Sequence, residues 1–295
     1  MQAHYFSKET KMKRWTILFA AIVLSIGTAL TLQKAPAIGS VVPAKPDLIV
    51  DQKRLLQNWV VRDEKLGATL CSVEEGNITP GDHRLVRFTV STPNIGTADL
   101  AVGDPNVHFA NGDGLFEVAS CHRHFHFRHY SLYELIDPAT GHTWRAAKRG
   151  FCMIDIEKFQ EFPGPANNER NYLSCGAPAT ATDPAIPGNQ GISVGWADTY
   201  VWQLAGQFFV LDGGDGQDPV PPGTYRIRIT VNPPFLAGPG EPCPFTDPIG
   251  FCHQLPELNY FNNVAEIEID IPDHPGKQGV GPLKNQPQIT TEPID

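Results

Sequence analysis

The stretch Tyr225-Arg-Ile-Arg-Ile-Thr-Val231 decides the fold class of this chain. Its apolar and polar residues alternate, so every second side chain leaves the same face of an extended strand. The stretch Ala265-Glu-Ile-Glu-Ile-Asp-Ile271 repeats the pattern, and Pro221-Pro-Gly223 supplies a turn immediately before the first stretch. Alternation of this kind predicts half-buried strands with one face on a core and the other in solvent.

Further strand signals and the overall composition agree with a β fold. The signals lie at residues 47–50, 84–90 and 130–136. Gly and Pro number 27 each in 295 residues, about 18% of the chain against roughly 12% on average, which favours short strands and turns. We therefore expect a mainly β fold: an antiparallel β-sandwich core with long irregular loops and few short helices. The long loops are expected at residues 152–198 and 232–262.

Residues 1–37 have the pattern of an export signal. Lys11, Lys13 and Arg14 precede an apolar run over residues 15–32, and Ala35-Pro-Ala37 offers small residues for cleavage. The run of 18 apolar residues is at the lower limit for a membrane span, so an uncleaved signal anchor is the alternative. Both interpretations predict a secreted, extracellular or periplasmic protein, which is membrane-tethered only if the signal stays uncleaved.

The remaining residues are expected to form one domain and a tail. The domain is predicted over residues 46–272, and residues 273–295, which carry Pro, Gly, Gln and Thr, are predicted to be a disordered tail. The formal net charge is -9, and residues 1–37 carry +4, so the remainder carries -13. An acidic body argues against a nucleic-acid partner and is compatible with cationic substrates.

All six cysteines follow the export signal, and their number is even. They are Cys71, Cys121, Cys152, Cys175, Cys243 and Cys252. In an exported protein this predicts up to three disulfides. Cys243 and Cys252 bracket a short Pro-rich loop and form the expected local pair, while the other pairings stay open on the residues alone.

Three histidines at alternate positions are the strongest candidates for a functional site. In the run Cys121-His-Arg-His-Phe-His126, the histidines 122, 124 and 126 would share one face of a strand. Imidazole is a common ligand of copper, zinc, iron and nickel. On a straight strand the outer Cα atoms would be roughly 13 Å apart, so a shared metal requires a bulge or a strong twist. A histidine-rich surface strand without metal is the alternative.

The histidine run, followed by His129-Tyr-Ser-Leu132, resembles the copper-binding segment of the lysyl oxidase family. Other segments match that family in the same order and cover about residues 46–271. They are Asp82-His-Arg84, Asn94-Ile-Gly-Thr97, Lys148-Arg-Gly-Phe-Cys152, Asp198-Thr-Tyr200, Pro222-Gly-Thr-Tyr225, Val231-Asn-Pro233 and Tyr260-Phe-Asn-Asn-Val264. Each match is weak alone, but the ordered combination is specific. The resemblance implies that residues 46–272 are a lysyl oxidase-like catalytic domain.

The resemblance implies an exported, copper-dependent amine oxidase of the protein-lysine 6-oxidase type, which acts on CH–NH2 groups with O2 as acceptor. Such an enzyme converts primary amines, in peptidyl lysine or small molecules, to aldehydes and releases hydrogen peroxide and ammonia. His122, His124 and His126 would bind Cu2+. Lys148 and Tyr200 would form the lysine tyrosylquinone cofactor.

The resemblance also suggests supporting residues. Asp198 is the candidate general base, because a carboxylate in a closed site can take a proton from a substrate carbon. His129 is a candidate for supporting the metal ligands. Cys121 and Cys175 would form a disulfide of the family type. The implied partners are O2 and a primary amine or a lysine-containing protein.

A structural Ca2+ site is implied as well, tying the first strand to the region of Asn262 and Asn263. The residues in matching positions are Asp47, Leu48 through its carbonyl, Glu257, Asn259, Asn262 and Asn263. Oxygen ligands of this mixture suit Ca2+. The other acidic segment, over residues 212–218, lacks the spacing of an EF-hand loop and is interpreted as a solvated turn.

Two alternatives come from other functional classes. A non-catalytic metal-binding β-sandwich, for adhesion or metal capture, would bind metal and form no quinone. A mononuclear zinc hydrolase could use the same three histidines and would consume no oxygen.

Overall fold

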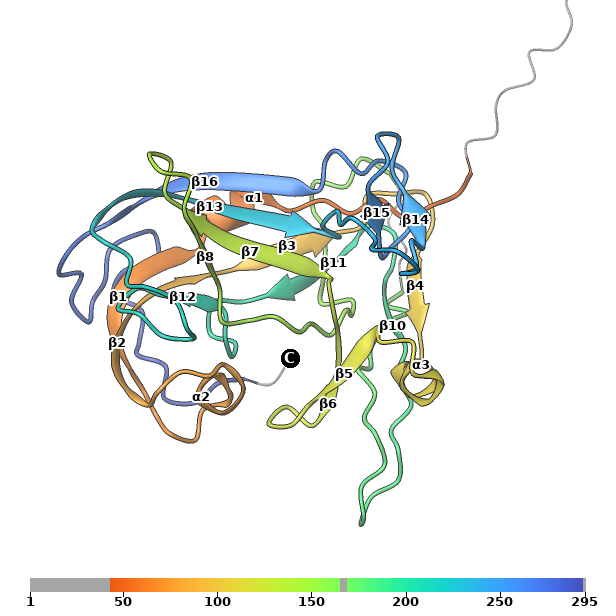
Figure 1. Cartoon of the computed structure of the whole chain (residues 1–295), viewed down its shortest axis with the longest axis horizontal. Coiled ribbons are helices and arrows are strands. Elements are labelled where there is room, and N and C mark those ends of the chain that lie inside the picture. Colours follow the sequence, from red (N-terminus) through yellow and green to blue (C-terminus); the bar gives the residue numbers. More distant parts are fainter. Residues whose placement is uncertain (1–42, 165–168, 294–295) are drawn as a thin grey trace, which may run out of the picture. The chain divides into compact units, whose positions relative to one another are not determined.

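The computed structural model describes residues 43–164 and 169–293 (Figure 1). The export signal predicted over residues 1–37 lies outside these ranges. Within the described ranges, no helix is both long enough and apolar enough to cross a membrane.

The described chain is mainly β, as predicted, and its largest sheet contains both alternating stretches. This antiparallel sheet has the order β16-β13-β7-β8. Its strands are β7 (Ser131–Ile136), β8 (Thr143–Arg145), β13 (Gly223–Val231) and β16 (Val264–Ile271). Ile227 lies opposite Ile267 in the register, and both side chains are buried. The alternation thus gives the sheet one apolar face.

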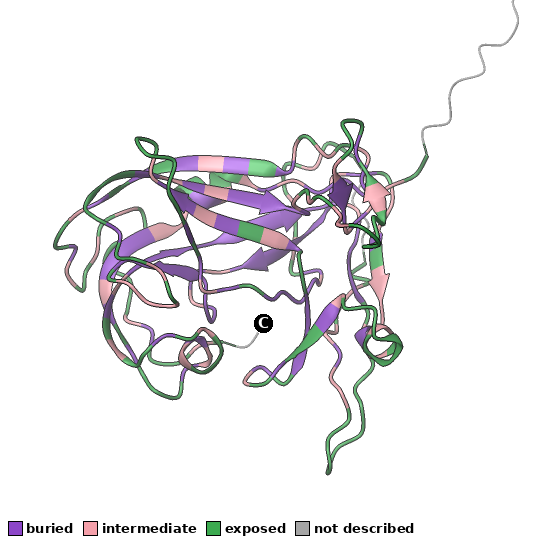
Figure 2. Ribbon diagram, viewed as in Figure 1, coloured by how far each residue is buried: buried purple, intermediate pink, exposed green. Residues whose placement is uncertain are grey.

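A second layer packs against that face (Figures 1 and 2). It contains the sheet β1-β2-β12 and the sheet β3-β11-β9. Their strands are β1 (Trp59–Leu66), β2 (Gly81–Phe88), β12 (Phe208–Val210), β3 (Val90–Pro93), β11 (Trp196–Tyr200) and β9 (Glu157–Lys158). Phe88 of β2 packs edge-on against Tyr133 of β7, with ring centroids 5.4 Å apart. Contacts of this kind form the apolar core of the sandwich.

The other elements are short, and local signals explain where the helices begin. They are α1 (Gln52–Gln57), α2 (Cys71–Glu75), α3 (Pro105–Asn111), β4 (Leu100–Gly103), β5 (Phe116–Ala119), β6 (His124–Phe127), β10 (Gln190–Ile192), β14 (Phe245–Thr246) and β15 (Cys252–His253). The Asp51 carboxylate caps α1 by accepting from the Arg54 amide at 2.9 Å. Asp104 caps α3, where Pro105 occupies the first position and Gly112 ends the helix in a left-handed conformation.

Two expected strands differ from those observed. Residues 47–50 form only an isolated bridge between Leu48 and Asn94. The stretch 84–90 belongs to two strands, β2 and β3, which pair with different partners. The break falls at Thr89, whose amide donates to the Asn58 carbonyl at 2.8 Å instead of to a neighbouring strand.

Residues 273–293 lie along the body of the domain, in contrast to the disordered tail expected from their composition. Val280 exchanges two backbone hydrogen bonds with Val61, of 2.9 and 2.8 Å. The guanidinium of Arg62 donates to the Pro287 carbonyl at 2.9 Å. Composition does not indicate these contacts, because they join main-chain groups of the segment to β1 instead of burying many apolar side chains.

The structure contains three disulfides: Cys71–Cys121, Cys152–Cys175 and Cys243–Cys252. The local pair Cys243–Cys252 confirms the prediction. The Cys121–Cys175 pair implied by the resemblance is wrong. Cys121 lies in the turn between β5 and β6, beside α2, and its Cα is 5.5 Å from that of Cys71.

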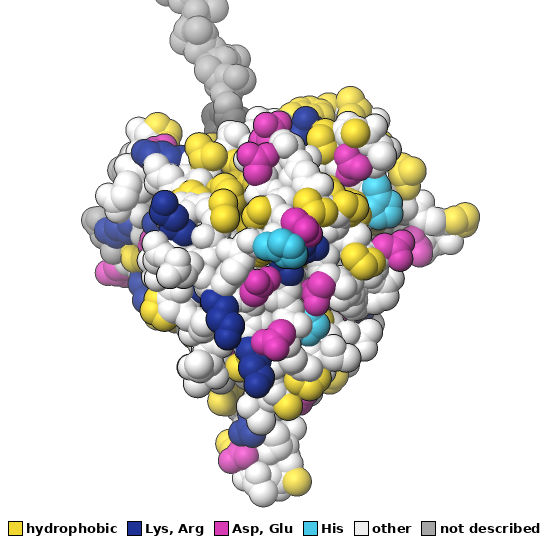
Figure 3. Space-filling model, turned by 90° about the vertical axis from the view of Figure 1, so that its left-hand side faces the viewer, with side chains coloured by type: hydrophobic (Ala, Val, Ile, Leu, Met, Phe, Trp, Pro, Cys, Tyr) yellow, Lys and Arg dark blue, Asp and Glu magenta, His cyan; other side chains and the backbone are white. Residues whose placement is uncertain are grey.

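Charged side chains are mixed on the face shown in Figure 3. Acidic, basic and apolar side chains alternate there without a large patch of one sign. The net negative charge is therefore not concentrated on this side of the molecule.

Candidate metal centre and catalytic pair

The three histidines gather at one end of the β5–β6 hairpin. His124 and His126 belong to β6, and His122 lies in the turn that joins β5 to β6. All three side chains are buried. Their ring centroids are 5.5 Å apart for 122 and 124, 5.2 Å for 122 and 126, and 5.0 Å for 124 and 126.

A turn, not a straight strand, brings the outer rings together. Arg123 has a positive φ of 60°, which is uncommon for a residue with a side chain. Its amide donates to the Ala119 carbonyl at 2.7 Å and closes the turn. The chain therefore folds His122 back toward His126. This removes the separation of roughly 13 Å that a straight strand would impose.

The ring arrangement suits a shared metal ion in its spacing and in its donors. Three imidazoles bonded to one ion at about 2.0–2.1 Å place their ring centroids roughly 5 Å apart, which is close to the observed distances. Within the described ranges, no group of three or more His, Cys, Asp or Glu side chains is arranged to hold an ion as it stands. Binding therefore requires the rings to turn. Imidazole donors favour copper or zinc over magnesium or calcium.

Glu75 contacts the histidine turn from α2. Its Oε2 lies 2.8 Å from Nδ1 of His122. Its Oε1 accepts from the backbone amides of Cys121 and His122, at 2.6 and 3.3 Å. This carboxylate therefore contacts both the backbone and the ring of the first histidine.

The segment 148–152 lies against the hairpin. Phe151 and Phe127 of β6 exchange backbone hydrogen bonds of 2.6 and 3.3 Å. Gly150 approaches His126 so closely that an added Cβ would lie 2.4 Å from its Nδ1. The Lys148 amide donates to the Gly206 carbonyl at 2.8 Å, which fixes the other end of the segment.

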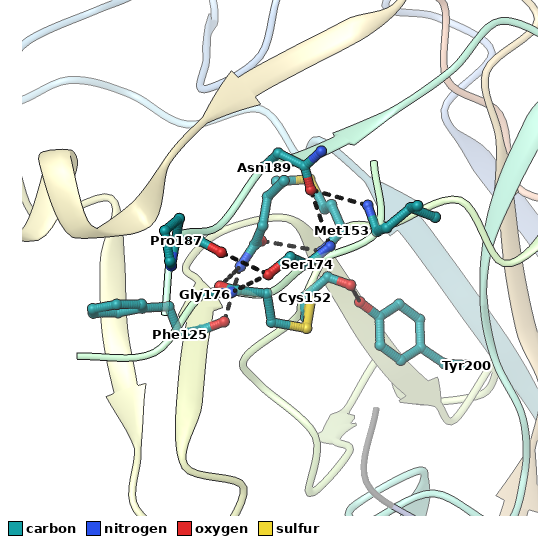
Figure 4. Close-up of a disulfide and its surroundings, with 11 residues drawn as sticks. Phe125, Cys152, Met153, Ser174, Gly176, Pro187, Asn189 and Tyr200 are labelled. Atoms are coloured by element: carbon teal, nitrogen blue, oxygen red, sulfur yellow. Dashed lines mark hydrogen bonds between the residues drawn. A yellow bond between two sulfur atoms is a disulfide. The ribbon is translucent and has the colours of Figure 1, made fainter. Parts of the chain in front are cut away.

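Lys148 and Tyr200 lie side by side, although 52 positions separate them in the sequence. The Nζ atom of Lys148 is 4.8 Å from the ring centroid of Tyr200. The Tyr200 hydroxyl donates to the Cys152 carbonyl at 2.9 Å, next to the Cys152–Cys175 disulfide (Figure 4). Phe151 packs edge-on against the Tyr200 ring, with centroids 5.2 Å apart. The phenol is therefore held in one position, with an amine near its ring.

Asp198 lies two residues before Tyr200 on the same strand, so both side chains are on one face of β11. Its side chain is buried. Burial raises the pKa of the neighbouring Tyr130 well above its usual value, and the charge of Asp198 raises it further. The Tyr130 hydroxyl bonds to Oγ1 of Thr92 at 2.5 Å and remains protonated.

Two cavities meet at Lys148. One, of about 340 Å³, is lined by Glu75, His122, His126 and Lys148, among others. The second, of about 950 Å³, is also lined by Lys148. Tyr200 lines neither cavity and is only 1% exposed, so it lies behind Lys148.

His129 is exposed and lines the second cavity, apart from the three gathered rings. Burial of part of its ring lowers the pKa of His129, and the charge of Arg128 lowers it further. Its place beside Lys148 in the cavity suits contact with a substrate better than support of the metal ligands.

The residues considered for Ca2+ are also brought together. Glu257 is buried and accepts from the Leu48 amide at 2.8 Å and from the side-chain amides of Asn232 and Asn263 at 2.5 and 2.7 Å. Asp47 accepts from the side-chain amide of Asn262 at 3.2 Å.

The hydrogen bonds around Asp47 and Glu257 determine which oxygen atoms of this cluster could bind Ca2+. The Leu48 amide faces Glu257, whereas the sequence comparison implied the Leu48 carbonyl as a ligand. A backbone hydrogen bond from Asn259 reaches Asp47. Among the described residues, the Oδ1 atoms of Asn262 and Asn263 are buried without a hydrogen-bond partner. These oxygens are available to a cation.

Sequence reasoning missed Glu75, Gly150 and the Cys152 carbonyl. Gly150 and Cys152 belong to the same motif as Lys148, so their place in that motif was the signal that could have indicated them. Glu75 has no local signal, because it reaches the histidines only through the fold.

Comparisons with known proteins agree with the geometry. The family described as Lysyl oxidase matches residues 46–241. Lysyl oxidase homolog 3A of Danio rerio is 28% identical over 204 residues, which cover 64% of this chain and 23% of that protein. Lysyl oxidase homolog 3 of Homo sapiens is 26% identical over 199 residues, with 64% and 23% covered. The match thus spans less than a quarter of the length of these relatives.

Proposed function

The chain belongs to the lysyl oxidase family, and from this premise we propose that it is an exported, copper-dependent amine oxidase. Its substrates would be primary amines, in peptidyl lysine or small molecules, which it would convert to aldehydes. The observation that carries the proposal is the distance of 4.8 Å between Nζ of Lys148 and the ring of Tyr200. A lysine amine beside a buried phenol is the pair required for a cross-linked quinone.

Each chain residue has a distinct role in this proposal. His122, His124 and His126 would hold copper, and bound copper would supply, with O2, the oxidation of the Tyr200 ring. The hydrogen bond from Tyr200 to the Cys152 carbonyl fixes the orientation of the ring. Lys148 supplies the amine that joins it.

Asp198 and the larger cavity beside Lys148 would serve proton transfer and substrate entry, respectively. Asp198 shares the buried face of β11 with Tyr200, so it is the candidate base for a proton on the substrate carbon. The cavity of about 950 Å³ beside Lys148 would admit an amine side chain. Its volume falls in the range of small-molecule sites.

The direct test of this function is amine-dependent peroxide release. The copper-loaded chain is incubated in air with a primary amine, and hydrogen peroxide and ammonia are measured. The proposal expects both products, with oxygen consumed. Bound copper without either product from any primary amine tested contradicts it.

A non-catalytic metal-binding protein is the second candidate. The observation that favours it is the burial of Tyr200, which is 1% exposed and lines neither cavity at Lys148. A carbonyl-reagent stain of the copper-loaded chain separates the two candidates. Only the oxidase gives a positive stain.

Gly150→Ala should weaken copper binding by about 10–100-fold. An added Cβ would lie 2.4 Å from Nδ1 of His126, so the ring must move from its place among the three histidines. Copper affinity is measured by competition with a chelator. Gly67→Ala is the matched control, because its Cβ would meet only Leu70 at 3.8 Å. Equal copper affinity in both variants would show that the position of His126 does not matter.

We also propose that the cluster around Glu257 binds Ca2+. Asp47, Glu257 and the buried Oδ1 atoms of Asn262 and Asn263 offer oxygen ligands of the kind that Ca2+ takes. Asn259 and the Leu48 carbonyl, which the resemblance implies as ligands, would complete the set after a local rearrangement, because the Leu48 amide faces Glu257 and the Asn259 amide donates to Asp47. Calcium should raise the melting temperature, and Glu257→Gln should remove that increase.

The metal-free protein should lose stability as the pH rises from about 4.5 to 8. Burial raises the pKa of Glu257 to about 8, and the charge of Asp47 adds to this. The unfolded chain releases this proton near its ordinary pKa of about 4.5, so the free energy of unfolding falls through this range, on the order of 3–5 kcal/mol. Urea unfolding in a chelator measures the fall. An identical pH dependence in Glu257→Gln would contradict the assignment.

A further inference from the structure

Glu75 contacts the first histidine of the candidate metal centre at two points. One oxygen lies 2.8 Å from Nδ1 of His122. The other accepts from the amides of Cys121 and His122, at 2.6 and 3.3 Å. The side chain of His122 is 3% exposed and that of Glu75 is 22% exposed, so the contact is largely shielded from water.

The fold holds Glu75 in place. It is the last residue of α2, and the first residue of that helix is joined to the histidine turn by the Cys71–Cys121 disulfide. At the other side of the helix, the Ser72 amide donates to the Glu292 carboxylate at 2.9 Å. The helix is thus fixed to both the histidine turn and the C-terminal segment, and its final carboxylate has little freedom to leave the ring.

A carboxylate in this position decides which ring nitrogen carries the proton. A neutral imidazole has one N–H group and one nitrogen with a free lone pair. Oε2 of Glu75 lies 2.8 Å from Nδ1 as a charged contact, and a small turn of the ring would align an Nδ1–H group with this carboxylate. The negative charge therefore favours the proton on Nδ1 and leaves Nε2 with the lone pair that a metal requires. The other acidic residue at this cavity, Glu117, lies 3.6 Å from Arg128 and is half exposed, so it does not offer the same constraint.

We propose that Glu75 is a positioning residue for copper binding: it orients His122 and keeps its proton on Nδ1, so that Nε2 is the metal-binding nitrogen. This inference rests on the copper site of the proposed function. It predicts that the carboxylate contributes to copper affinity without itself binding the ion.

Glu75→Gln tests the role of the charge with little change of shape. The side-chain carbonyl of Gln can still accept from the amides of Cys121 and His122, but its NH2 group cannot accept the Nδ1 proton. Copper affinity should fall about 10–100-fold, and the Cu2+ electron paramagnetic resonance spectrum should shift. Glu74→Gln is the control, since it removes the same charge from an exposed position of the same helix and should change neither.

A second measurement is independent of copper and of variant folding. Nitrogen-15 NMR of the metal-free chain at alkaline pH reports which ring nitrogen of His122 carries the proton. The proposal expects the proton on Nδ1. A proton on Nε2, or unchanged copper affinity in a folded Glu75→Gln variant, overturns it. If the wild type binds no copper at all, the proposed function fails, while the NMR result still decides the positioning role.

Discussion

Tyr200→Phe should abolish amine-dependent peroxide release, to below about one thousandth of the wild-type rate, because the proposed quinone would carry the redox chemistry. Phenylalanine keeps the ring beside Lys148 but lacks the oxygen from which a quinone begins. The substitution leaves the buried Cys152 carbonyl without this donor and costs about 1–3 kcal/mol of stability. Copper should therefore remain bound by a folded but inactive protein.

Tyr225→Phe is the matched control for this loss. The Tyr225 hydroxyl donates to the Pro221 carbonyl at 2.8 Å, so the substitution removes the same kind of hydrogen bond on β13. It should cost about 0.5–1.5 kcal/mol of stability, less than Tyr200→Phe because Pro221 is exposed, and it should leave peroxide release intact. Wild-type peroxide release from Tyr200→Phe would contradict the assignment of Tyr200.

Lys148→Arg should have an effect of the same size for a different reason. The guanidinium keeps the positive charge over the Tyr200 ring, but it stays protonated and is a poor nucleophile. A bond between positions 148 and 200 should therefore not form. Peroxide release and intact mass are measured together, and both the activity and the cross-link should be lost.

Lys158→Arg controls for the change of cation. Nζ of Lys158 lies 5.6 Å from the ring centroid of Trp196, so it is another lysine that faces an aromatic ring. This variant should remain active. If Lys148→Arg also remains active, a cationic contact explains the position of Lys148 and the cofactor proposal is wrong.

The histidine run shows what sequence alone could predict about the site. The residue types and their order indicated three ligands near one another, and the structure does gather them. The alternating pattern does not predict the turn that brings the three imidazole rings together, because that turn depends on a positive φ at Arg123. A non-glycine residue gives no local signal for that conformation.

Long-range contacts explain the remaining differences. The partner of Cys121 is decided by the packing of α2 beside the turn, which no spacing rule predicts. Glu75 reaches the histidines through the same packing. The C-terminal segment is polar in composition, yet it is held by backbone hydrogen bonds to Val61. Clean alternation, by contrast, predicted β13 and β16 correctly, since it reports directly on a half-buried sheet.

The central claim is a covalent link between Lys148 and Tyr200, and peptide mass spectrometry tests it most directly. The chain is incubated with copper in air, digested, and compared with a sample kept free of metal. The account predicts one species containing both peptides in the copper-treated sample and separate peptides in the control. Separate, unmodified peptides from a preparation that releases peroxide with amines would contradict it.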